Sequence, residues 1–424
     1  MNQREARTRA APPGPESGYA WARLAVSVLL MTIGGVGMYA VSVVLPQVQA
    51  DFGADRADVS LTYTATMIGF GVGGILMGKL ADRFGVIAPL LIGAVGLGLG
   101  LIAAGTASSL WVFGLAHGLL LGLLGTSATF APLVADTSLW FDRRRGIALA
   151  ICMSGNYLAG ALWPPVIQHF TQTGGWRPAY VGIGVFCLLT MLPLALVYRR
   201  PAPLLPATPV PRAGAAAPAA AHARPLGMSP GRLQLLLSVA GVACCVAMAM
   251  PQVHIVAYCT DLGIGPARGA QMMSLMLGMG IVSRLASGWI ADRIGGLRTL
   301  LLGSFLQAVA LVAFLFADGV VSLYLVSALF GLFQGGIVPS YPLVVREYFS
   351  PREAGGRVGT VLMATLLGMA LGGWLSGAVF DWTGSYRAAF VNGIGWNLLN
   401  LAICLYLLGR DRRLRPQWRA VAAA

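Results

Sequence analysis

Charged residues are scarce in this chain. Of its 424 residues, 10% are Asp, Glu, Lys or Arg, and Lys79 is the single lysine. Soluble domains carry about 25% charged residues, whereas 57% of the positions here are hydrophobic and the mean hydropathy is +0.74. A surface of this composition could not be kept in water. The composition therefore excludes a soluble globular fold and indicates a protein whose solvent is the lipid bilayer.

The sequence also lacks the motifs of metal sites and of soluble enzymes. Its six cysteines fall in apolar stretches without a CxxC pair, which predicts neither a disulfide framework nor a zinc site. There is no HExxH, no P-loop and no GxGxxG after a strand, so we expect no enzyme, no cofactor and no metal. The net charge of +14 comes from arginines dispersed between apolar runs, which argues against nucleic acid as a partner.

The apolar runs have the lengths of transmembrane helices. The longest segment without Asp, Glu, Lys or Arg covers 52 residues, from 84 to 135. A bilayer core of about 30 Å takes about 20 residues of helix, so this segment must hold two spans. The same counting predicts twelve spans, at residues 23–49, 58–80, 86–105, 110–137, 146–170, 177–198, 233–259, 267–290, 298–317, 320–346, 357–380 and 387–408.

These spans divide the chain into two tails, two halves and a linker. The polar tails cover residues 1–22 and 409–424, the six-helix halves cover 23–198 and 233–408, and a linker rich in Pro and Ala covers 199–232. If both termini are cytoplasmic, 24 of the 29 basic residues lie on the cytoplasmic side, as the positive-inside rule requires. We therefore predict a multi-pass protein of the inner (plasma) membrane with both termini in the cytoplasm.

An internal repeat relates the two halves. GKLADRFG at residues 78–85 returns as GWIADRIG at residues 288–295, an offset of 210, and TGGWRPAY from Thr173 returns at the same offset as TGSYRAAF from Thr383. Because six is an even number, both copies enter the membrane from the same face. Parallel duplicated halves are typical of transporters that rock about a central site. The sequence thus predicts an all-α membrane protein of two parallel six-helix halves that works by alternating access.

The repeated segment resembles the signature of the major facilitator superfamily, G-x-x-x-D-R-x-G between spans two and three, and the resemblance covers essentially the whole chain. It implies the major facilitator fold. It also implies a cytoplasmic latch between the halves, with an ordinary solvated turn as the alternative; the residues of this latch are Asp82, Arg83, Asp292 and Arg293. Asp136, near the cytoplasmic end of span four, is expected within reach of Arg83 and so to belong to the same latch.

Two further segments resemble the monocarboxylate transporters and their bacterial relatives, including the oxalate:formate exchangers. One is ESGYAW at residues 16–21, which departs from the family pattern at Ser17 and Tyr19. The other is WFDRRRGIALAICMSG at residues 140–155. The resemblance implies a secondary transporter for a small carboxylate. It leaves open which carboxylate is carried and whether a proton or a counter-anion is coupled to it.

Arg284 is the strongest candidate for substrate binding. It stands eight residues before Asp292 and so about 12 Å inside the membrane, where a charge costs about 2.5–3.5 kcal/mol. The resemblance implies that this span-eight arginine binds the substrate carboxylate; snorkelling to the membrane edge is the alternative. Animal members hold an acidic residue and a lysine where this chain has Gly280 and Val41. One fixed positive charge neutralises one carboxylate, which favours a monocarboxylate over a dianion.

Four other polar residues within the spans are candidates for the transport path. Tyr39, Asn156 and Gln334 are expected to line the substrate cavity, with interhelical hydrogen bonds as the alternative. His254, near the outer end of span seven, is the candidate for proton coupling, because histidine changes its charge in the physiological range. A satisfied interfacial side chain is the equal alternative for His254. We expect the transporter to be a monomer.

The main competing function is a facilitator-type exporter of drugs or other hydrophobic solutes. Such an exporter predicts a carboxylate near the membrane midplane to attract cations, and the sequence has Arg284 there instead. A channel does not account for a duplication in one register with a latch at one face, and a receptor would need a sizeable soluble domain. A transporter of a small organic anion is therefore the leading hypothesis.

Overall fold

The computed structural model describes residues 16–141, 143–200 and 225–423. All regular structure in these ranges is helical, and twelve helical stretches are long and apolar enough to cross a membrane. The prediction of an all-α protein with twelve spans is therefore confirmed. Most of the predicted tail 1–22 and of the linker 199–232 lies outside the described residues.

The first six spans are built as follows: α1 (Gly18–Gly34) with α2 (Val36–Phe52); α3 (Arg56–Phe84); α4 (Ile87–Gly105); α5 (Leu110–Leu115), the π-helical η2 (Ala116–Thr126) and α6 (Ala131–Trp140); α7 (Arg145–Gly174); and α8 (Trp176–Ala195) with the 3₁₀ turn η3 (Leu196–Arg199). The 3₁₀ turn η4 (Pro225–Gly227) precedes the last six spans: α10 (Pro230–Asp261); α11 (Pro266–Ile294); α12 (Gly296–Phe314); α13 (Val320–Gln334) with α14 (Ile337–Tyr348); α15 (Pro351–Thr383); and α16 (Tyr386–Ala423). A chain in lipid must satisfy its backbone hydrogen bonds internally, which is why every span is helical.

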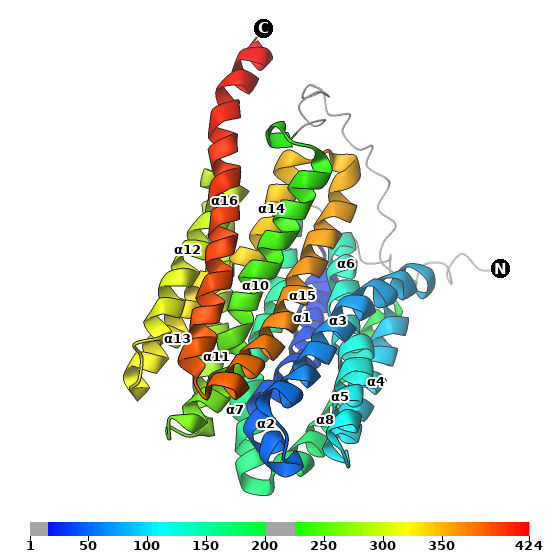
Figure 1. The fold of residues 1–424 in the computed structure, drawn as a ribbon. Helices are drawn as coiled ribbons and strands as arrows, with labels where there is room; N and C mark the ends of the chain where they lie inside the picture. The colour runs from blue at the N-terminus through cyan, green and yellow to red at the C-terminus, as the bar shows by residue number, and fades with distance from the viewer. Residues whose placement is uncertain (1–15, 142, 201–224, 424) are drawn as a thin grey trace, which may run out of the picture.

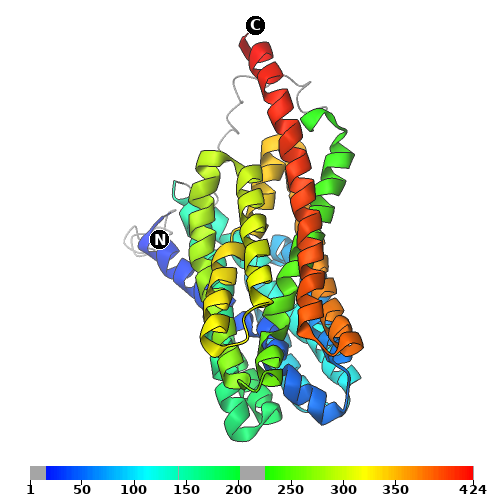
Figure 2. The same ribbon diagram turned by 60° about the vertical axis from the view of Figure 1, so that its left-hand side comes forward.

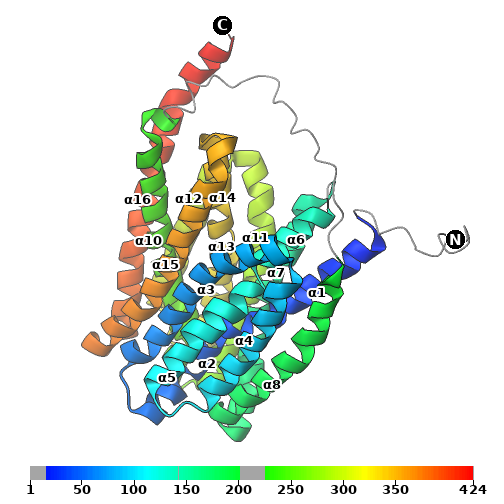
Figure 3. The same ribbon diagram turned by 90° about the vertical axis from the view of Figure 1, so that its right-hand side faces the viewer.

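The helices form two bundles that stand side by side. One bundle holds α1 to α8 and the other α10 to α16, and the bundles meet where α3 packs on α15 and α7 packs on α11 (Figure 1). The start of α1, the start of α10 and the end of α16 lie at one end of the molecule, which we call the termini side (Figure 3). The opposite end, near Phe52 and Asp261, is the far side. Figure 2 shows α16 extending beyond its neighbours on the termini side.

Close packing between the two halves is found toward the far side. Thr64 of α3 donates a hydrogen bond to the carbonyl oxygen of Ala370 in α15 at 2.7 Å, and a Cβ at Gly377 would lie 3.0 Å from an atom of α3. At Gly78 and Gly359, near the termini-side ends of the same two helices, a Cβ would meet nothing within 4 Å. The halves are therefore closed against each other on the far side, and Figure 1 shows α3 leaning away from α15 toward the termini side.

Three of the twelve spans are interrupted. Gly35 separates α1 from α2, residues 127–130 separate η2 from α6, and a break beginning at Gly335 separates α13 from α14. Discontinuous helices are typical of spans that line a substrate path in transporters. Tyr39 follows the first break by four residues, and Gln334 immediately precedes the third. Two of the candidate residues thus lie at helix breaks.

Candidate functional site

Arg284 lies within α11, ten residues before its last residue, Ile294, which places it about 15 Å from the termini-side end of the helix. Its side chain is half-buried. The Nε atom is buried, and among the described residues it has no hydrogen-bond partner. A guanidinium with an unused donor inside a membrane span is a site at which an anion can bind.

The guanidinium of Arg284 stacks on a ring from the other half of the molecule. Its Cζ lies 4.5 Å from the ring centroid of Tyr157 in α7, within the range of a cation–π interaction. Gly280, one turn before Arg284, makes room for this ring, because a Cβ at Gly280 would overlap the edge of Tyr157. The glycine that stands where animal members hold an acid thus lets an aromatic ring lie against the arginine.

Tyr39 joins this cluster from the first span. It lies within electrostatic range of both Tyr157 and Arg284. Its side chain is 6% exposed, and its ring packs on Gly160 of α7, where a Cβ would lie 2.9 Å from the Tyr39 Cζ. The structure therefore brings two of the predicted residues, Tyr39 and Arg284, together at the boundary between the halves.

Asn156 and Gln334 make interhelical contacts. Asn156 is half-buried, and its Nδ2 lies 4.0 Å from the Sδ of Met38. Gln334 is fully buried, and its Oε1 accepts a hydrogen bond from Gln252 of α10 at 2.8 Å. The Nε2 of Gln334 has no partner among the described residues. Contacts of this kind are expected if the two residues join helices instead of lining the substrate cavity. A role of Asn156 and Gln334 in substrate binding stays a prediction.

His254 is fully buried inside the bundle. Its Nε2 lies 2.8 Å from the carbonyl oxygen of Gly373 in α15, and its Nδ1 lies 3.4 Å from the hydroxyl of Tyr386 in α16. A carbonyl oxygen can only accept, so Nε2 carries the proton and Nδ1 accepts from Tyr386. The same tyrosine hydroxyl accepts a hydrogen bond from Arg56 of the first half at 2.7 Å. One tyrosine thus connects His254 to the other half.

The four residues of the predicted latch are exposed at the termini side, at the ends of α3 and α11; they are Asp82, Arg83, Asp292 and Arg293. Within the described residues none of them forms an ion pair. The guanidinium of Arg293 lies over the ring of Trp289, on its own helix, at 3.3 Å. Because α3 leans away from α15 on this side, a latch between the halves stays a prediction for another state of the molecule.

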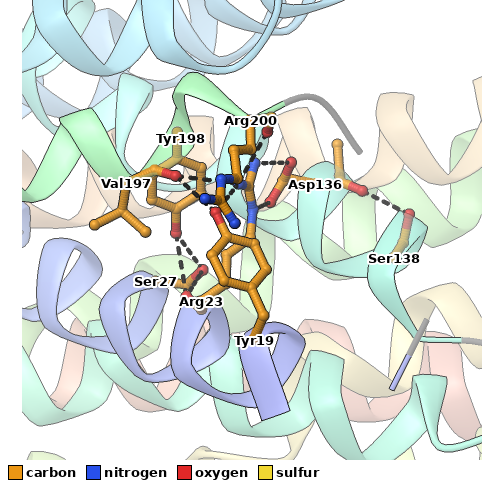
Figure 4. A network of polar contacts seen from close by, with 9 residues as sticks. Tyr19, Arg23, Ser27, Asp136, Ser138, Val197, Tyr198 and Arg200 are labelled. Atoms are coloured by element: carbon orange, nitrogen blue, oxygen red, sulfur yellow. Dashed lines mark hydrogen bonds and ion pairs between the residues drawn. The ribbon is translucent and has the colours of Figure 1, made fainter. Parts of the chain in front are cut away.

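Asp136 binds Arg23 of α1 and not Arg83, which was the expected partner. The Nε and one terminal nitrogen of Arg23 donate to the two carboxylate oxygens of Asp136 at 2.7 and 2.8 Å (Figure 4). The other terminal nitrogen lies 3.4 Å from the carbonyl oxygen of Val197 and 3.1 Å from that of Arg200. Both charged side chains are buried, so this full set of partners offsets their desolvation. Asp136 is thereby neutralised within the first half.

The two segments that resemble monocarboxylate transporters lie against each other. The backbone N–H of Glu16 donates to the carbonyl oxygen of Trp140 at 3.0 Å. The ring of Tyr19 lies 5.3 Å from that of Trp140, and the ring of Trp21 lies 5.0 Å from that of Phe141. The segments therefore form one junction, beside the pair of Arg23 and Asp136, between the start of span one and the loop after span four.

Sequence reasoning missed Tyr157 and Arg56. Tyr157 carries no signal in the sequence beyond its position next to Asn156. In the sequence Arg56 is only one of the four basic residues that the topology assigns to the outer side, together with Arg177, Arg268 and Arg387. The repeat offered a signal for Arg56. The equivalent position in the second half, 210 residues later, is Pro266, so the arginine is present in one half only.

An apolar cavity of about 730 Å³ lies between α1, α7 and α8, and its lining includes Trp163, Phe170 and Phe186. The last two side chains are about half exposed, so this cavity opens on the apolar outer surface of the first half. It contains none of the predicted site residues. In the part of the chain that the structure describes, no group of three or more His, Cys, Asp or Glu side chains could hold a metal ion.

Comparisons with known proteins place the chain in a family. The family model of the Major Facilitator Superfamily matches residues 27–330 and 285–422. Monocarboxylate transporter 13 of Bos taurus is 30% identical over 314 residues, which cover 74% of this chain and 71% of the bovine protein. The MFS-type transporter YcxA of Bacillus subtilis is 25% identical over 374 residues, which cover 86% of each protein.

The fold has a close counterpart among solved structures. A bacterial homologue of the human lysosomal transporter Spinster, in an inward-facing and occupied conformation, matches with a TM-score of 0.69 over 94% of this chain and 98% of its own, at 14% sequence identity. This likeness shows the fold alone, and the sequence matches show the family. The chain belongs to the major facilitator superfamily and, within it, to the family of the monocarboxylate transporters.

Proposed function

We propose that this transporter is a secondary active carrier that moves a small organic anion, a monocarboxylate, across the inner membrane by alternating access. The observation that carries the proposal is the half-buried guanidinium of Arg284 at the boundary between the halves, with a buried Nε that no atom of the described residues engages. A planar guanidinium binds a carboxylate through two parallel hydrogen bonds. We propose Tyr39, Asn156 and Gln334 as further substrate contacts.

The charges around Arg284 favour a monoanion. Its neighbours Tyr157 and Gly280 are uncharged, so one positive charge is available to one carboxylate. An exporter of hydrophobic cations would need a free carboxylate inside the membrane. Asp136, a buried acidic residue in span four, is already paired with Arg23. This charge distribution supports the anion transporter over the drug exporter.

We propose further that the termini side faces the cytoplasm and that the molecule is in an inward-facing state. The distribution of basic residues supports the orientation, and the packing of α3 on α15 toward the far side supports the state. In the outward-facing state the termini-side ends of the halves would approach each other. The latch would then form from Asp82, Arg83, Asp292 and Arg293, with Asp136 behind it.

Proton coupling is proposed to act through His254. In its neutral form the ring accepts from Tyr386 and donates to Gly373. Protonation would turn Nδ1 into a donor, which breaks the bond from the tyrosine hydroxyl and places a second positive charge near Arg56. External acid would therefore loosen the contacts that close the far side. The proton would leave inward when the site reopens toward the cytoplasm.

Uptake by purified protein in liposomes, with a panel of labelled monocarboxylates and dicarboxylates, tests the proposed function. In Arg284→Ala the affinity for the transported monocarboxylate should fall about ten- to a hundredfold, because hydrogen bonds to a charged group contribute about 1.5–3 kcal/mol. Arg284→Lys should also lose affinity, because it keeps the charge but not the paired hydrogen bonds.

The matched control is Arg268→Ala, which removes an exposed arginine from the first turn of the same helix. It should transport as the wild type does. If Arg284→Ala reaches the membrane in normal amount and binds its substrate with near wild-type affinity, Arg284 is not the carboxylate anchor.

A further inference from the structure

Arg56 is a buried arginine at the far side. Its Nε donates to Gln49 of α2 in its own half at 3.0 Å, and its other partners come from the opposite half. It is the first residue of α3, and its side chain is 7% exposed. One terminal nitrogen donates to Asp261 at the end of α10 at 2.5 Å and to the hydroxyl of Tyr386 in α16 at 2.7 Å. The guanidinium also lies 4.2 Å from the ring centroid of Phe380 in α15. One side chain of the first half therefore contacts three spans of the second half.

The backbone at the start of α3 is held from the second half as well. The two carboxylate oxygens of Asp381, in α15, accept the N–H groups of Arg56 and Ala57 at 3.2 and 2.7 Å. The first N–H groups of a helix lack partners within the helix, and the helix dipole favours a negative charge there. Asp381 thus caps a helix of the other half, and the side-chain and backbone contacts of Arg56 act at the same place.

The internal repeat shows that these contacts are a specific departure from symmetry. Asp51 pairs with Arg177 within the first half at 2.8 Å. The residues 210 positions later are Asp261 and Arg387, so the repeat predicts the same pair within the second half. In the structure Arg387 pairs with Asp318 at 3.2 Å, and Asp261 pairs across the halves with Arg56.

Two residues of this cluster, Arg56 and Asp381, are not repeated at the equivalent position of the other half. Pro266 stands 210 positions after Arg56, and Thr171 stands 210 positions before Asp381. The pairs Arg177–Asp51 and Arg387–Asp318 are both exposed, whereas the Arg56 side chain is buried. Exposed ion pairs contribute little, but an arginine that loses its partners when buried is strongly disfavoured. Of these three ion pairs, the one formed by Arg56 therefore has the largest consequence for the position of the two halves.

We propose that Arg56 with Asp261, Asp381 and Tyr386 is the outer gate of the transporter, which we call the Arg56 gate. It holds the far side closed in the state described here, and its contacts must separate before a solute can reach Arg284 from that side. The gate gives Arg56 a positioning role for the transport cycle, since it acts through the arrangement of the halves and does not touch the solute. The inference rests on the proposed alternating access.

A distance measurement between the halves tests the gate without measuring transport. Spin labels are placed on cysteines introduced at Asp58 of α3 and Arg268 of α11, both exposed near the far side. The six native cysteines are buried. The parent protein, which lacks the two introduced cysteines, is treated with the same spin label to control for any reaction with the native ones. Double electron–electron resonance on the reconstituted protein then gives the populations of far-side-closed and far-side-open molecules.

In Arg56→Gln the ratio of open to closed molecules should rise about tenfold, at the low end of what the loss of charge-assisted hydrogen bonds produces. Asp261→Asn should shift it in the same direction by a smaller factor and serves if Arg56→Gln does not fold. The matched control, Arg177→Gln, breaks the equivalent pair within the first half and should leave the distances unchanged.

Two results would overturn the gate. One is a folded Arg56→Gln or Asp261→Asn protein with the wild-type distance distribution. The other is an equal shift in Arg177→Gln, which would mean that the far side loosens after any loss of charge there. The distance measurement does not depend on uptake. A failure of the proposed gate can therefore be distinguished from a failure of the proposed role of Arg284 in substrate binding.

Discussion

Arg23, Arg56 and Arg284 differ in what they bind, and the difference supports the roles that we propose for them. Arg23 and Arg56 each hold a carboxylate from another helix, at 2.7 and 2.5 Å. Arg284 lies against an aromatic ring, and its buried Nε has no hydrogen-bond partner in the part of the chain that the structure describes. A charge inside the membrane is retained at a cost of several kcal/mol only where a partner or a ligand compensates it. For Arg284 the missing partner is the proposed carboxylate.

At the same scale, the contacts of His254 give an expected pH dependence. The sign follows from the neutral ring: a proton added at Nδ1 removes the hydrogen bond from Tyr386 and places a positive charge near Arg56, so the far side opens more readily. Acid should therefore stimulate uptake, and His254→Gln should flatten the profile. Uptake is measured between about pH 5.5 and 8, around the reference pKa of about 6.5.

His169→Gln is the matched control for this experiment, because His169 is an exposed histidine near the far-side end of α7. It should keep the wild-type profile. A His254→Gln protein whose pH profile equals that of the wild type would transfer the pH dependence to the substrate's own protonation or to anion exchange.

At the scale of the helix, close contact between α11 and α13 depends on glycine. A Cβ at Gly331 would overlap the backbone oxygen of Met276 in α11, and a Cβ at Gly335 would lie 2.9 Å from the Cα of Gly280. Small residues allow helix backbones to approach closely in membranes, where packing drives association. These contacts place the interrupted span ten beside the part of α11 that carries Arg284.

Gly331→Ala should therefore destabilise the protein by about 1–3 kcal/mol, the usual cost of overpacking. The apparent Tm of the purified protein in detergent measures this, with Gly182→Ala in α8 as the matched control, because a Cβ there meets nothing within 4 Å. Equal melting temperatures for the two variants would show that α11 and α13 separate without cost.

For the whole molecule, the repeat and the charge distribution predict one orientation. Residues 206–223 of the linker and the C-terminal Ala424 should both be cytoplasmic, because 24 of the 29 basic residues then lie on that side. Fusions of a reporter that is active only in the cytoplasm, and of one active only in the periplasm, measure the location of each site. Periplasmic activity at either site would contradict the orientation.

The sequence by itself determined the number of spans, the duplication and the unusual position of Arg284. These follow from hydrophobic length and charge, which act locally along the chain and can be counted residue by residue. The expected latch residues likewise came from a local repeat. The orientation follows from the same counting and awaits its measurement.

Only the tertiary structure decided which side chains meet. The partner of Asp136 is Arg23 and not Arg83, because α1 and α6 lie together in the first half. The repeat predicts a bond between Asp261 and Arg387, yet Asp261 binds Arg56 across the halves. The physical reason is that contacts between the halves depend on how the halves pack against each other. This packing, of α3 on α15 and of α7 on α11, is a property of the folded molecule and not of any local segment. A repeat predicts contacts within each half, but a contact between the halves can replace one of them, and only the assembled molecule shows which contact forms.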